Sequence, residues 1–439
     1  MRARARELGF DVVGVARADL PLDVDHVRYL AFLADGRHGE MSYLADNAAA
    51  HQRLDGEEIL PGARSVVCVG LRYRDTQAGE AAASPLARTV ARYARGQDYH
   101  NFMRKRLRRL AKLLRTLEPG AQARPLCDVA PVLERAWAAR AGLGFVGKNG
   151  LLITPGQGSF QLLGEVVTTV ALTPGTPIEE RCGSCTRCLD ACPTGAFVAP
   201  FQLDPRRCLS YLSIELHAAP PESLRAGFEE RLFGCDVCQD VCPFNARPPA
   251  SAPPSPFQPL PRWGASGLAS LVTLDQAAWE GVAEGTPLKR SGRAGLARNA
   301  VLVAAGRLAR RPGQVGEDEV DARAALAAGL AHDDASVREV AAWAERRGAP
   351  PVEVQGPGAT APTPEPPRDA APSRGGANGE AKEAKEKGES DVEGAKSRVR
   401  VGVQLTGPTS FRGGPALPGS VPSTRPSRGA RRKRRRLPK

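Results

Sequence analysis

The chain has 439 residues, of which 42% are hydrophobic and 25% charged, with a formal net charge of +13. This length exceeds what one hydrophobic core usually holds, so we expect folded domains followed by a tail. No apolar run is long enough to span a membrane and the charged start MRARARELGF lacks a leader pattern, which excludes a membrane protein and predicts a soluble, cytoplasmic one.

Most of the positive charge lies in the last part of the chain. Residues 351–439 contain 18 Lys or Arg against 9 Asp or Glu, so they carry +9 of the net charge. This segment is rich in Pro, Gly, Ala, Ser and Glu and lacks hydrophobic periodicity, which predicts a disordered, low-complexity basic tail. Two interpretations stay open: a solvated extension without a specific role, and a nonspecific tether for polyanions.

Helices and short strands alternate in residues 1–174. The pattern predicts, in order, a helix over Arg2–Leu8, a strand over Val12–Ala16, a helix around Val24–Leu33 and a strand after the Pro61–Gly62 turn. This alternation predicts an α/β or α+β domain at the N-terminus, taken as α/β within a chain of overall α+β class. No dinucleotide-binding glycine pattern or P-loop is present, so a nicotinamide or ATP site is unsupported.

A basic amphipathic helix is expected near residue 110, and a further helix over Val132–Ala141. The apolar face of the first helix consists of Met103, Leu107, Leu110, Leu114 and Leu117. The opposite face carries Arg104, Lys105, Arg106, Arg108, Arg109, Lys112 and Arg115. Such a face is usually solvated, but it could also meet a phosphate backbone.

Eight cysteines have the spacing of a two-cluster ferredoxin. The first block, CGSCTRCLDACP, has C-x2-C-x2-C-x3-C-P spacing, in which the fourth Cys ligates the other cluster. We therefore assign Cys182, Cys185, Cys188 and Cys242 to one four-iron cluster, and Cys192, Cys208, Cys235 and Cys238 to the other. Two structural zinc sites are the alternative, although zinc has no use for the x3-C-P ending that occurs twice. Cys68 and Cys127 are expected to be plain buried thiols.

Short Ala/Leu/Val-rich helices are expected after the cysteines, over residues 297–311, 319–332 and 337–347. Their spacing is typical of HEAT-like helical pairs, with ordinary helical packing as the alternative. The expected layout is a catalytic domain over 1–174, a ferredoxin-like domain over 175–250, a HEAT-like segment over 251–350 and the tail over 351–439.

Several longer motifs are more specific than the cysteine spacing alone. They are HGEM (38–41), LPGARSV (60–66), RYARGQDYH (92–100), DVAPVLERAWAARAGLGFVGKN (128–149), GSFQLLGE (158–165) and RRCLSYLSIEL (206–216). With the cysteine blocks, they resemble the epoxyqueuosine reductase family from about residue 5 to about residue 348. Phe145 and Phe244 depart from this pattern, since Trp is expected at both, and residues 351–439 have no counterpart.

The resemblance implies an oxidoreductase that reduces epoxyqueuosine to queuosine at the wobble position of tRNA. Base-off cobalamin would occupy the N-terminal domain, and two [4Fe-4S] clusters would pass electrons to its cobalt. Asp128 matches the family's proton donor; such a carboxyl would serve best if burial raised its pKa, because an acid must be protonated when the epoxide oxygen leaves. On spacing alone, Asp128 would more simply cap a helix.

The resemblance also implies contacts to the cofactor and the RNA. The cobalamin contacts are Arg53, Asp128, Leu152, Leu163, Ser210, Asp236 and Val237, although Arg53 could instead be a surface residue. His38 and His100 are not expected to ligate cobalt. Ile214, Glu215 and Leu216 match the family's RNA-contacting stretch. The target base itself must leave the stack and enter a pocket to react.

Other activities remain open at this level. A reductive dehalogenase also resembles a cobalamin domain with two clusters, and a pure electron carrier or an RNA-binding scaffold would need no cobalamin. The expected partners are tRNA and an unidentified electron donor, without a membrane, and the resemblance implies a monomer.

Overall fold

The structure is a computed structural model that describes residues 1–46, 48–74, 83–128, 130–246, 257–310 and 316–347. All of these residues belong to one contact unit. The predicted tail over 351–439 lies outside the described residues. In the described part of the chain, no helix is long and apolar enough to cross a membrane.

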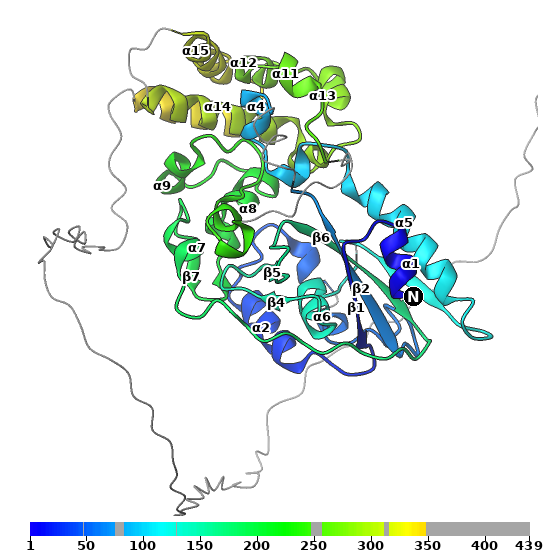
Figure 1. The fold of residues 1–439 in the computed structure, drawn as a ribbon. Helices are drawn as coiled ribbons and strands as arrows, with labels where there is room; N and C mark the ends of the chain where they lie inside the picture. Colours follow the sequence, from blue (N-terminus) through cyan, green and yellow to red (C-terminus); the bar gives the residue numbers. More distant parts are fainter. Residues whose placement is uncertain (47, 75–82, 129, 247–256, 311–315, 348–439) are drawn as a thin grey trace, which may run out of the picture. The chain divides into compact units, whose positions relative to one another are not determined.

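A four-stranded sheet organises the N-terminal part (Figure 1). Its order is β1-β2-β6-β3, with bounds Val12–Arg17, Ser65–Arg72, Gln161–Thr168 and Ala123–Leu126. The two predicted strands are confirmed, and of the two fold classes left open for this part α+β is right and α/β is wrong, because all three strand pairs are antiparallel. Alternation along the chain does not determine strand direction: β2 pairs with β6, about ninety residues later, without a parallel crossover unit.

Strand β2 separates two apolar cores because successive side chains point to opposite faces of a sheet. Val67 and Val69 pack with residues of α1 (Arg2–Glu7) and α5 (Tyr99–Leu114). Val66 and Cys68 pack with residues of α6 (Glu134–Arg140). The sheet is therefore covered on both faces (Figure 1).

The predicted helices of this part are confirmed as α1, α2 (Asp23–Ala34), α5 and α6. In α5, the expected apolar face is buried up to Leu114, but Leu117 is 47% exposed because the helix has already ended. The basic face is exposed apart from Arg106, which donates to the Leu8 carbonyl at 2.9 Å and lies over the Phe102 ring.

The cysteine region consists of short elements. Two hairpins are β4 (Phe145–Val146) with β5 (Leu152–Ile153), and β7 (Phe197–Ala199) with β8 (Gln202–Leu203). The helices are α7 (Arg187–Asp190), α8 (Leu209–Ile214), α9 (Glu222–Arg225) and α10 (Val237–Asp240). Single 3-10 turns cover Ser42–Leu44, Ala48–Gln52, Arg92–Ala94, Pro205–Arg207, Ala226–Phe228, Pro243–Asn245 and Pro287–Ser291.

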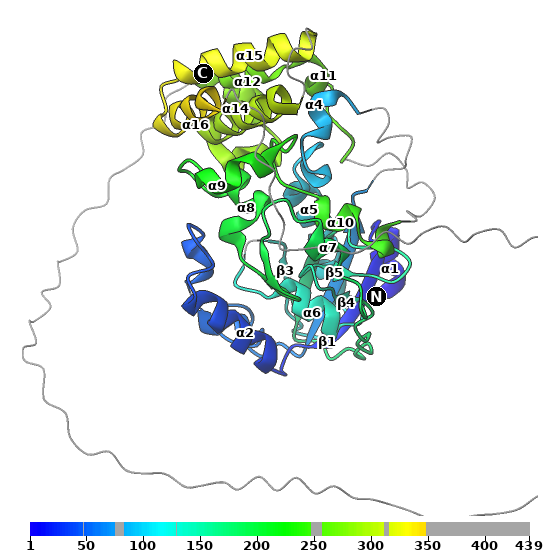
Figure 2. The ribbon, with the colours of Figure 1, turned by 90° about the vertical axis from the view of Figure 1, so that its left-hand side faces the viewer.

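The three predicted C-terminal helices are confirmed as α14 (Gly292–Arg310), α15 (Glu317–Leu330) and α16 (Ala335–Arg346). They follow α11 (Arg262–Ala265), α12 (Leu268–Val272) and α13 (Gln276–Ala283). Their core also contains Leu86 and Val90, from the segment around α4 (Pro85–Arg88). Figure 2 shows α4 beside α11 at this end of the molecule. An early piece of the chain is thus part of the C-terminal core.

Candidate functional site

Asp128 lies two residues beyond the end of β3, at a bend in the backbone. Its φ of +53° is in the left-handed region, which non-glycine residues adopt at a cost and often at functional sites. Its side chain is 59% exposed. Asp128 does not cap a helix, because α6 begins at Glu134 with Leu133 before it. The capping interpretation is therefore wrong.

Two residues at the start of α5 contact the Asp128 carboxylate. Tyr99 Oη donates to Asp128 Oδ2 at 2.5 Å, and His100 Nε2 lies 3.5 Å from the same oxygen. The other ring nitrogen of His100, Nδ1, lies 2.8 Å from Asp98 Oδ1. Both His100 nitrogens therefore face carboxylates.

These contacts lower the pKa of Asp128. Burial alone would raise its pKa, but the hydrogen bonds from His100 and Tyr99 hold the pKa below its ordinary value. The hydrogen bonds to Asp128 and Asp98 raise the pKa of His100 to about 9. Burial therefore does not raise the pKa of Asp128 on balance, and at neutral pH the proton of this pair resides on His100.

Two further carboxyl groups lie behind Asp128. The backbone N–H of Asp128 donates to Glu134 Oε1 at 2.7 Å. Burial, followed by the charge of Asp128, raises the pKa of Glu134 to about 7. Glu165 in β6 is fully buried, and burial together with the nearby Glu134 raises its pKa well above the usual range. The site therefore combines an exposed carboxylate with a half-buried and a fully buried carboxyl group.

The predicted cobalamin contacts in the N-terminal part lie in two settings. Arg53 leaves half of its side chain exposed while it pairs with Asp55 at 2.7 Å. Leu152 belongs to the apolar core between the sheet and α6, and Leu163 packs against that core from β6. A hollow elsewhere is lined by none of the predicted contacts; its residues are Gln97, Asp98, Asn101, Phe102, Leu260, Arg262, Glu284 and Gly285.

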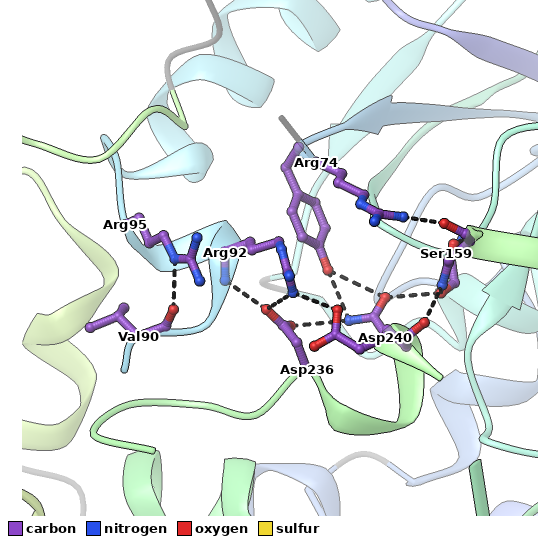
Figure 3. Close-up of polar contacts among 10 residues, drawn as sticks. Arg74, Val90, Arg92, Arg95, Ser159, Asp236 and Asp240 are labelled. Atoms are coloured by element: carbon purple, nitrogen blue, oxygen red, sulfur yellow. Dashed lines mark hydrogen bonds and ion pairs between the residues drawn. The ribbon is translucent and has the colours of Figure 1, made fainter. Parts of the chain in front are cut away.

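The remaining predicted contacts lie beside cysteines. Ser210 is half-buried in α8, two residues after Cys208. Asp236 and Val237 lie between Cys235 and Cys238, and Val237 begins α10. The Asp236 carboxylate is already engaged, because Oδ2 accepts from both the backbone and the side chain of Arg92 (Figure 3).

The thiols of the first predicted cluster set are neighbours. Burial raises the pKa values of Cys182 and Cys188, the former to about 11, and Cys242 adds to both shifts through its charge. Cys185 contributes in the same way to Cys188 and Cys242. Cys242 thus approaches the first block although it belongs to the second.

The second predicted set shows the same kind of proximity. Burial raises the pKa values of Cys208, Cys235 and Cys238, and that of Cys235 reaches about 12. Cys192 adds to the shift of Cys208, and Cys208 adds to those of Cys235 and Cys238. Among the described residues, no three potential ligands converge on the position of a single metal ion.

The cluster loops are tied to the N-terminal part by polar contacts (Figure 3). The Arg92 guanidinium lies 3.1 Å from Asp236 and 2.9 Å from Asp240. Ser159 receives a hydrogen bond from Asn245 at 2.9 Å and its backbone N–H donates to the Asn245 side chain at 2.8 Å. These contacts hold the second cysteine block against the 3-10 turn at Arg92 and the turn before β6.

The loop at Lys148 contacts both cysteine blocks. Lys148 Nζ donates to the carbonyls of Gly183 and Cys185, and Asn149 Nδ2 donates to the Cys238 carbonyl at 3.4 Å. A single loop of the N-terminal part thus lies against both predicted cluster sites.

The predicted RNA-contacting residues lie at the end of α8 and just beyond it. Arg290 binds the Glu215 carboxylate through both Nε and NH2, at 2.8 to 3.1 Å, and lies over the Tyr43 ring. The charge of Arg290 also lowers the pKa of Asp128. The Glu215 and Arg290 pair is therefore close to the exposed carboxylate.

Arg298 in α14 supports this stretch from inside the protein. It is fully buried and donates to the carbonyls of Leu212, Leu216 and Ala218 at 2.6 to 2.9 Å. The adjacent Asn299 donates to the Ser213 carbonyl at 2.7 Å. The chain from Leu212 to Ala218 is thereby shaped by α14.

Sequence reasoning assigned no role to Tyr99, Glu134, Glu165, Arg290 or Arg298. The first three lie inside motifs that carried the resemblance, so the signal was present without a role attached to each residue. Arg290 and Arg298 are two of many arginines, and only their contacts distinguish them.

Two family models match the chain. The model described as "4Fe-4S double cluster binding domain" matches residues 181–245, which contain all eight predicted ligands. The model described as "Epoxyqueuosine reductase QueG, DUF1730" matches residues 53–129, which end just after Asp128. The chain therefore contains a ferredoxin-like domain for two four-iron clusters.

Named relatives and solved structures agree with these matches. The chain is 42% identical to the epoxyqueuosine reductase of Gloeobacter violaceus over 68% of this chain and 93% of the relative. It is 38% identical to that of Escherichia coli over 68% and 78%.

Two solved epoxyqueuosine reductases have similar folds, and each match covers 78% of this chain and 87% of the other. One, bound to an epoxyqueuosine-modified stem loop of tyrosine tRNA, has a TM-score of 0.67 at 31% identity. The other, from Bacillus subtilis with its catalytic aspartate loop swung out of the active site, has a TM-score of 0.65 at 30% identity. From its motifs, its site and these similarities, the chain belongs to the epoxyqueuosine reductase family of oxidoreductases.

Proposed function

We propose that this chain reduces epoxyqueuosine to queuosine at the wobble position of tRNA. The observation that carries the proposal is the similarity to the Gloeobacter relative along 93% of that protein's length. The exposed Asp128 beside Tyr99 and His100 supplies the acid group that loss of an epoxide oxygen requires. The reaction takes place in the cytoplasm, where tRNA is modified.

The two [4Fe-4S] clusters are bound by the sets expected from the spacing. Cys182, Cys185, Cys188 and Cys242 bind one cluster, and Cys192, Cys208, Cys235 and Cys238 bind the other. The mutual effects of these thiols on their pKa values support this division, and Cys188 and Cys238 connect the two sets in the same way. Crossed ligation brings the clusters close together, which favours electron transfer between them.

Cobalamin is held by Arg53, Leu152, Leu163, Ser210, Asp236 and Val237, with Asp128 facing the substrate. The residues fit such a group chemically: Arg53 and Asp128 keep exposed polar atoms for its amides, while Leu152 and Leu163 border an apolar core. When bound, cobalamin supplies the low-potential electrons that the clusters deliver. Asp236 and Val237 lie between two cluster ligands, so a contact there gives a short electron path.

The protein's own residues bind, orient and protonate the substrate. Asp128 gives a proton to the departing epoxide oxygen, and Tyr99 orients the carboxylate through its hydrogen bond. His100 holds the proton that Asp128 receives before the oxygen leaves, since the imidazole lies 3.5 Å from the carboxylate. General acid catalysis of this kind requires a proton within hydrogen-bond reach of the leaving atom.

The RNA is bound by Ile214, Glu215 and Leu216 at the mouth of this site. Glu215 and Arg290 lie near Asp128, which supports a path for the flipped base. Helices α12 to α16 form a HEAT-like support for that stretch, and the exposed basic face of α5 contributes to phosphate binding. The enzyme acts as a monomer with a separate electron donor.

The test is anaerobic turnover of epoxyqueuosine-containing tRNA by the full chain with both clusters reconstituted, cobalamin and a chemical reductant. We expect queuosine formation that depends on cobalamin. Asp128→Asn should lower the rate by about 10²–10⁴-fold and lower the pKa of His100 from about 9, measured by NMR. Asp11→Asn is the matched control, because Asp11 pairs with Arg72 outside the site. Intact clusters and bound cobalamin without product would overturn the proposal.

A further inference from the structure

The proposed reaction consumes more protons than the exposed site holds. Breaking both C–O bonds of an epoxide and releasing the oxygen as water takes two electrons and two protons. The electrons come from the reduced cobalamin of the proposed function. At neutral pH, Asp128 and His100 together hold one proton, because Asp128 is ionised and His100 is charged. A second proton must reach Asp128 in each turnover.

The Glu134 carboxyl group is hydrogen-bonded to the backbone of Asp128. Glu134 is the first residue of α6, and its Oε1 accepts the Asp128 backbone N–H at 2.7 Å. This bond holds the Glu134 carboxyl beside the left-handed bend of Asp128.

Glu165 lies deeper, in the apolar layer between the sheet and α6. It is opposite Cys68 of β2 and Leu126 of β3, and residues directly opposite in antiparallel strands share a face. Cys68 and Leu126 both belong to the core that contains the α6 residue Trp137. Glu165 is 0% exposed, and neither carboxyl oxygen makes a hydrogen bond of normal geometry among the described residues, although Glu134 lies near enough to raise its pKa.

Burying an ionised carboxyl group without hydrogen bonds costs free energy of folding. Such a group therefore stays protonated or has a functional role. We propose that half-buried Glu134 and fully buried Glu165 form a carboxyl pair that stores one proton and passes it to Asp128 during turnover. Glu165 gives the stored proton to Glu134, Glu134 passes it on to the Asp128 carboxylate, and solvent refills the pair afterwards. Both residues act through Asp128, so they are positioning and proton-supplying residues. This inference rests on the proposed function.

The charges around the pair favour a stored proton. After burial, the nearby Glu134 raises the pKa of Glu165, and the charge of Asp128 raises the pKa of Glu134. The titratable groups that face them come from four elements: Cys68 of β2, Cys127 after β3, His100 of α5 and Arg135 of α6. Of these, only His100 and Arg135 favour ionisation of Glu134.

The first test measures the stored proton without turnover. Infrared difference spectra of the full chain with reconstituted clusters, taken across pH, should show the C=O stretching band of a protonated carboxyl that persists at pH 8. Glu165→Gln should remove this band, since Gln has the same shape and no titratable proton. Absence of the band from the wild type at pH 8 would overturn the inference whatever the turnover result.

The second test measures the delivery of the proton by single-turnover kinetics. Glu165→Gln should slow the reaction roughly tenfold at pH 8 and less than about twofold at pH 6, where Asp128 takes protons from water more readily. Glu165→Asp should restore most of the rate, and Cys68→Ala, directly opposite in the sheet, should leave the pH profile unchanged. A wild-type pH profile in Glu165→Gln would contradict the inference. A wild type that makes no queuosine, with clusters and cobalamin bound, would instead contradict the proposed function.

Discussion

Arg298 and Glu165 are equally buried but differ in how their polar atoms are satisfied. Both are 0% exposed. The Arg298 guanidinium donates to three backbone carbonyls and to the Asn299 side chain. Neither oxygen of Glu165 has a partner within the described part of the chain.

The difference separates a structural role from a chemical one. A buried charge with all its hydrogen bonds holds neighbouring backbone in place, and Arg298 does so for the RNA-contacting stretch. A buried carboxyl without partners weakens the fold, so its retention needs another reason, which proton storage provides. Substitutions at the two positions should therefore change stability in opposite directions.

The largest effect is expected from Arg298→Met. It should lower the apparent free energy of unfolding by about 3–5 kcal/mol, because the carbonyls of Leu212, Leu216 and Ala218 lose their donors inside the protein. Urea denaturation of the full chain, followed by circular dichroism, measures this loss. Arg323→Met is the control, since Arg323 is 67% exposed and should change stability by less than about 0.5 kcal/mol. Equal effects of the two variants would show that Arg298 does not have the structural role described above.

Glu165→Met should have the opposite sign. Replacing an unpaired buried carboxyl with an apolar side chain of similar size should raise the free energy of unfolding by about 1–3 kcal/mol. The same variant should turn over more slowly, because Met cannot carry a proton. The same denaturation experiment measures the gain. A loss of stability would show that Glu165 has partners in solution and would end the contrast with Arg298.

The stability contribution of Glu134 should depend on pH. Its pKa is raised from its ordinary value of 4.5 to about 7 in the folded chain, so the folded state binds more protons than the unfolded state between these values. Stability should therefore fall as pH rises through this interval and then become level. Midpoints of thermal unfolding at a series of pH values, for the wild type and Glu134→Gln, measure the effect. The Glu134→Gln variant should lose less stability than the wild type as pH rises through this interval. If the midpoint falls with pH equally in both proteins, the pKa of Glu134 is not raised.

The smallest effect on stability is expected at Arg290, the exposed counterpart of Arg298. Arg290 is 51% exposed, so Arg290→Gln should change the free energy of unfolding by less than about 1 kcal/mol although it breaks the bidentate bond to Glu215. Binding of the tRNA stem loop should nevertheless weaken, and its salt dependence should become less steep, in a fluorescence titration. Unchanged binding at low salt would place the RNA away from Glu215.

The sequence predicted those features that depend on local spacing. The cysteine pattern indicated two clusters, and the β2 run SVVCVGLR gave a strand because its apolar residues fill both faces of a covered sheet. The helices of both ends were found from their periodicity. The antiparallel order was missed because strand direction depends on contacts between residues distant in sequence.

The parts of the site that the sequence could not predict depend on register and on distant partners. Glu165 faces α6 only because it is opposite Cys68 and Leu126, which is a consequence of strand pairing. The lowered pKa of Asp128 depends on Tyr99 and His100, about thirty residues earlier in the chain. No local pattern around Asp128 encodes either relation.

The segment that crosses from the sheet into the C-terminal core limits how this protein can be divided or recombined. Val90 forms a parallel bridge with Phe233, the Arg95 carbonyl accepts the Trp263 indole N–H at 2.8 Å, and Leu86 is buried among the helices of that core. A fragment that ended at residue 174 would expose these apolar side chains to water and would invite aggregation. Exchange of the cluster region or the helices with those of a distant relative would leave the early segment without its partners. The segments expected to form separate domains therefore share packing contacts, and an engineered variant has to keep them together.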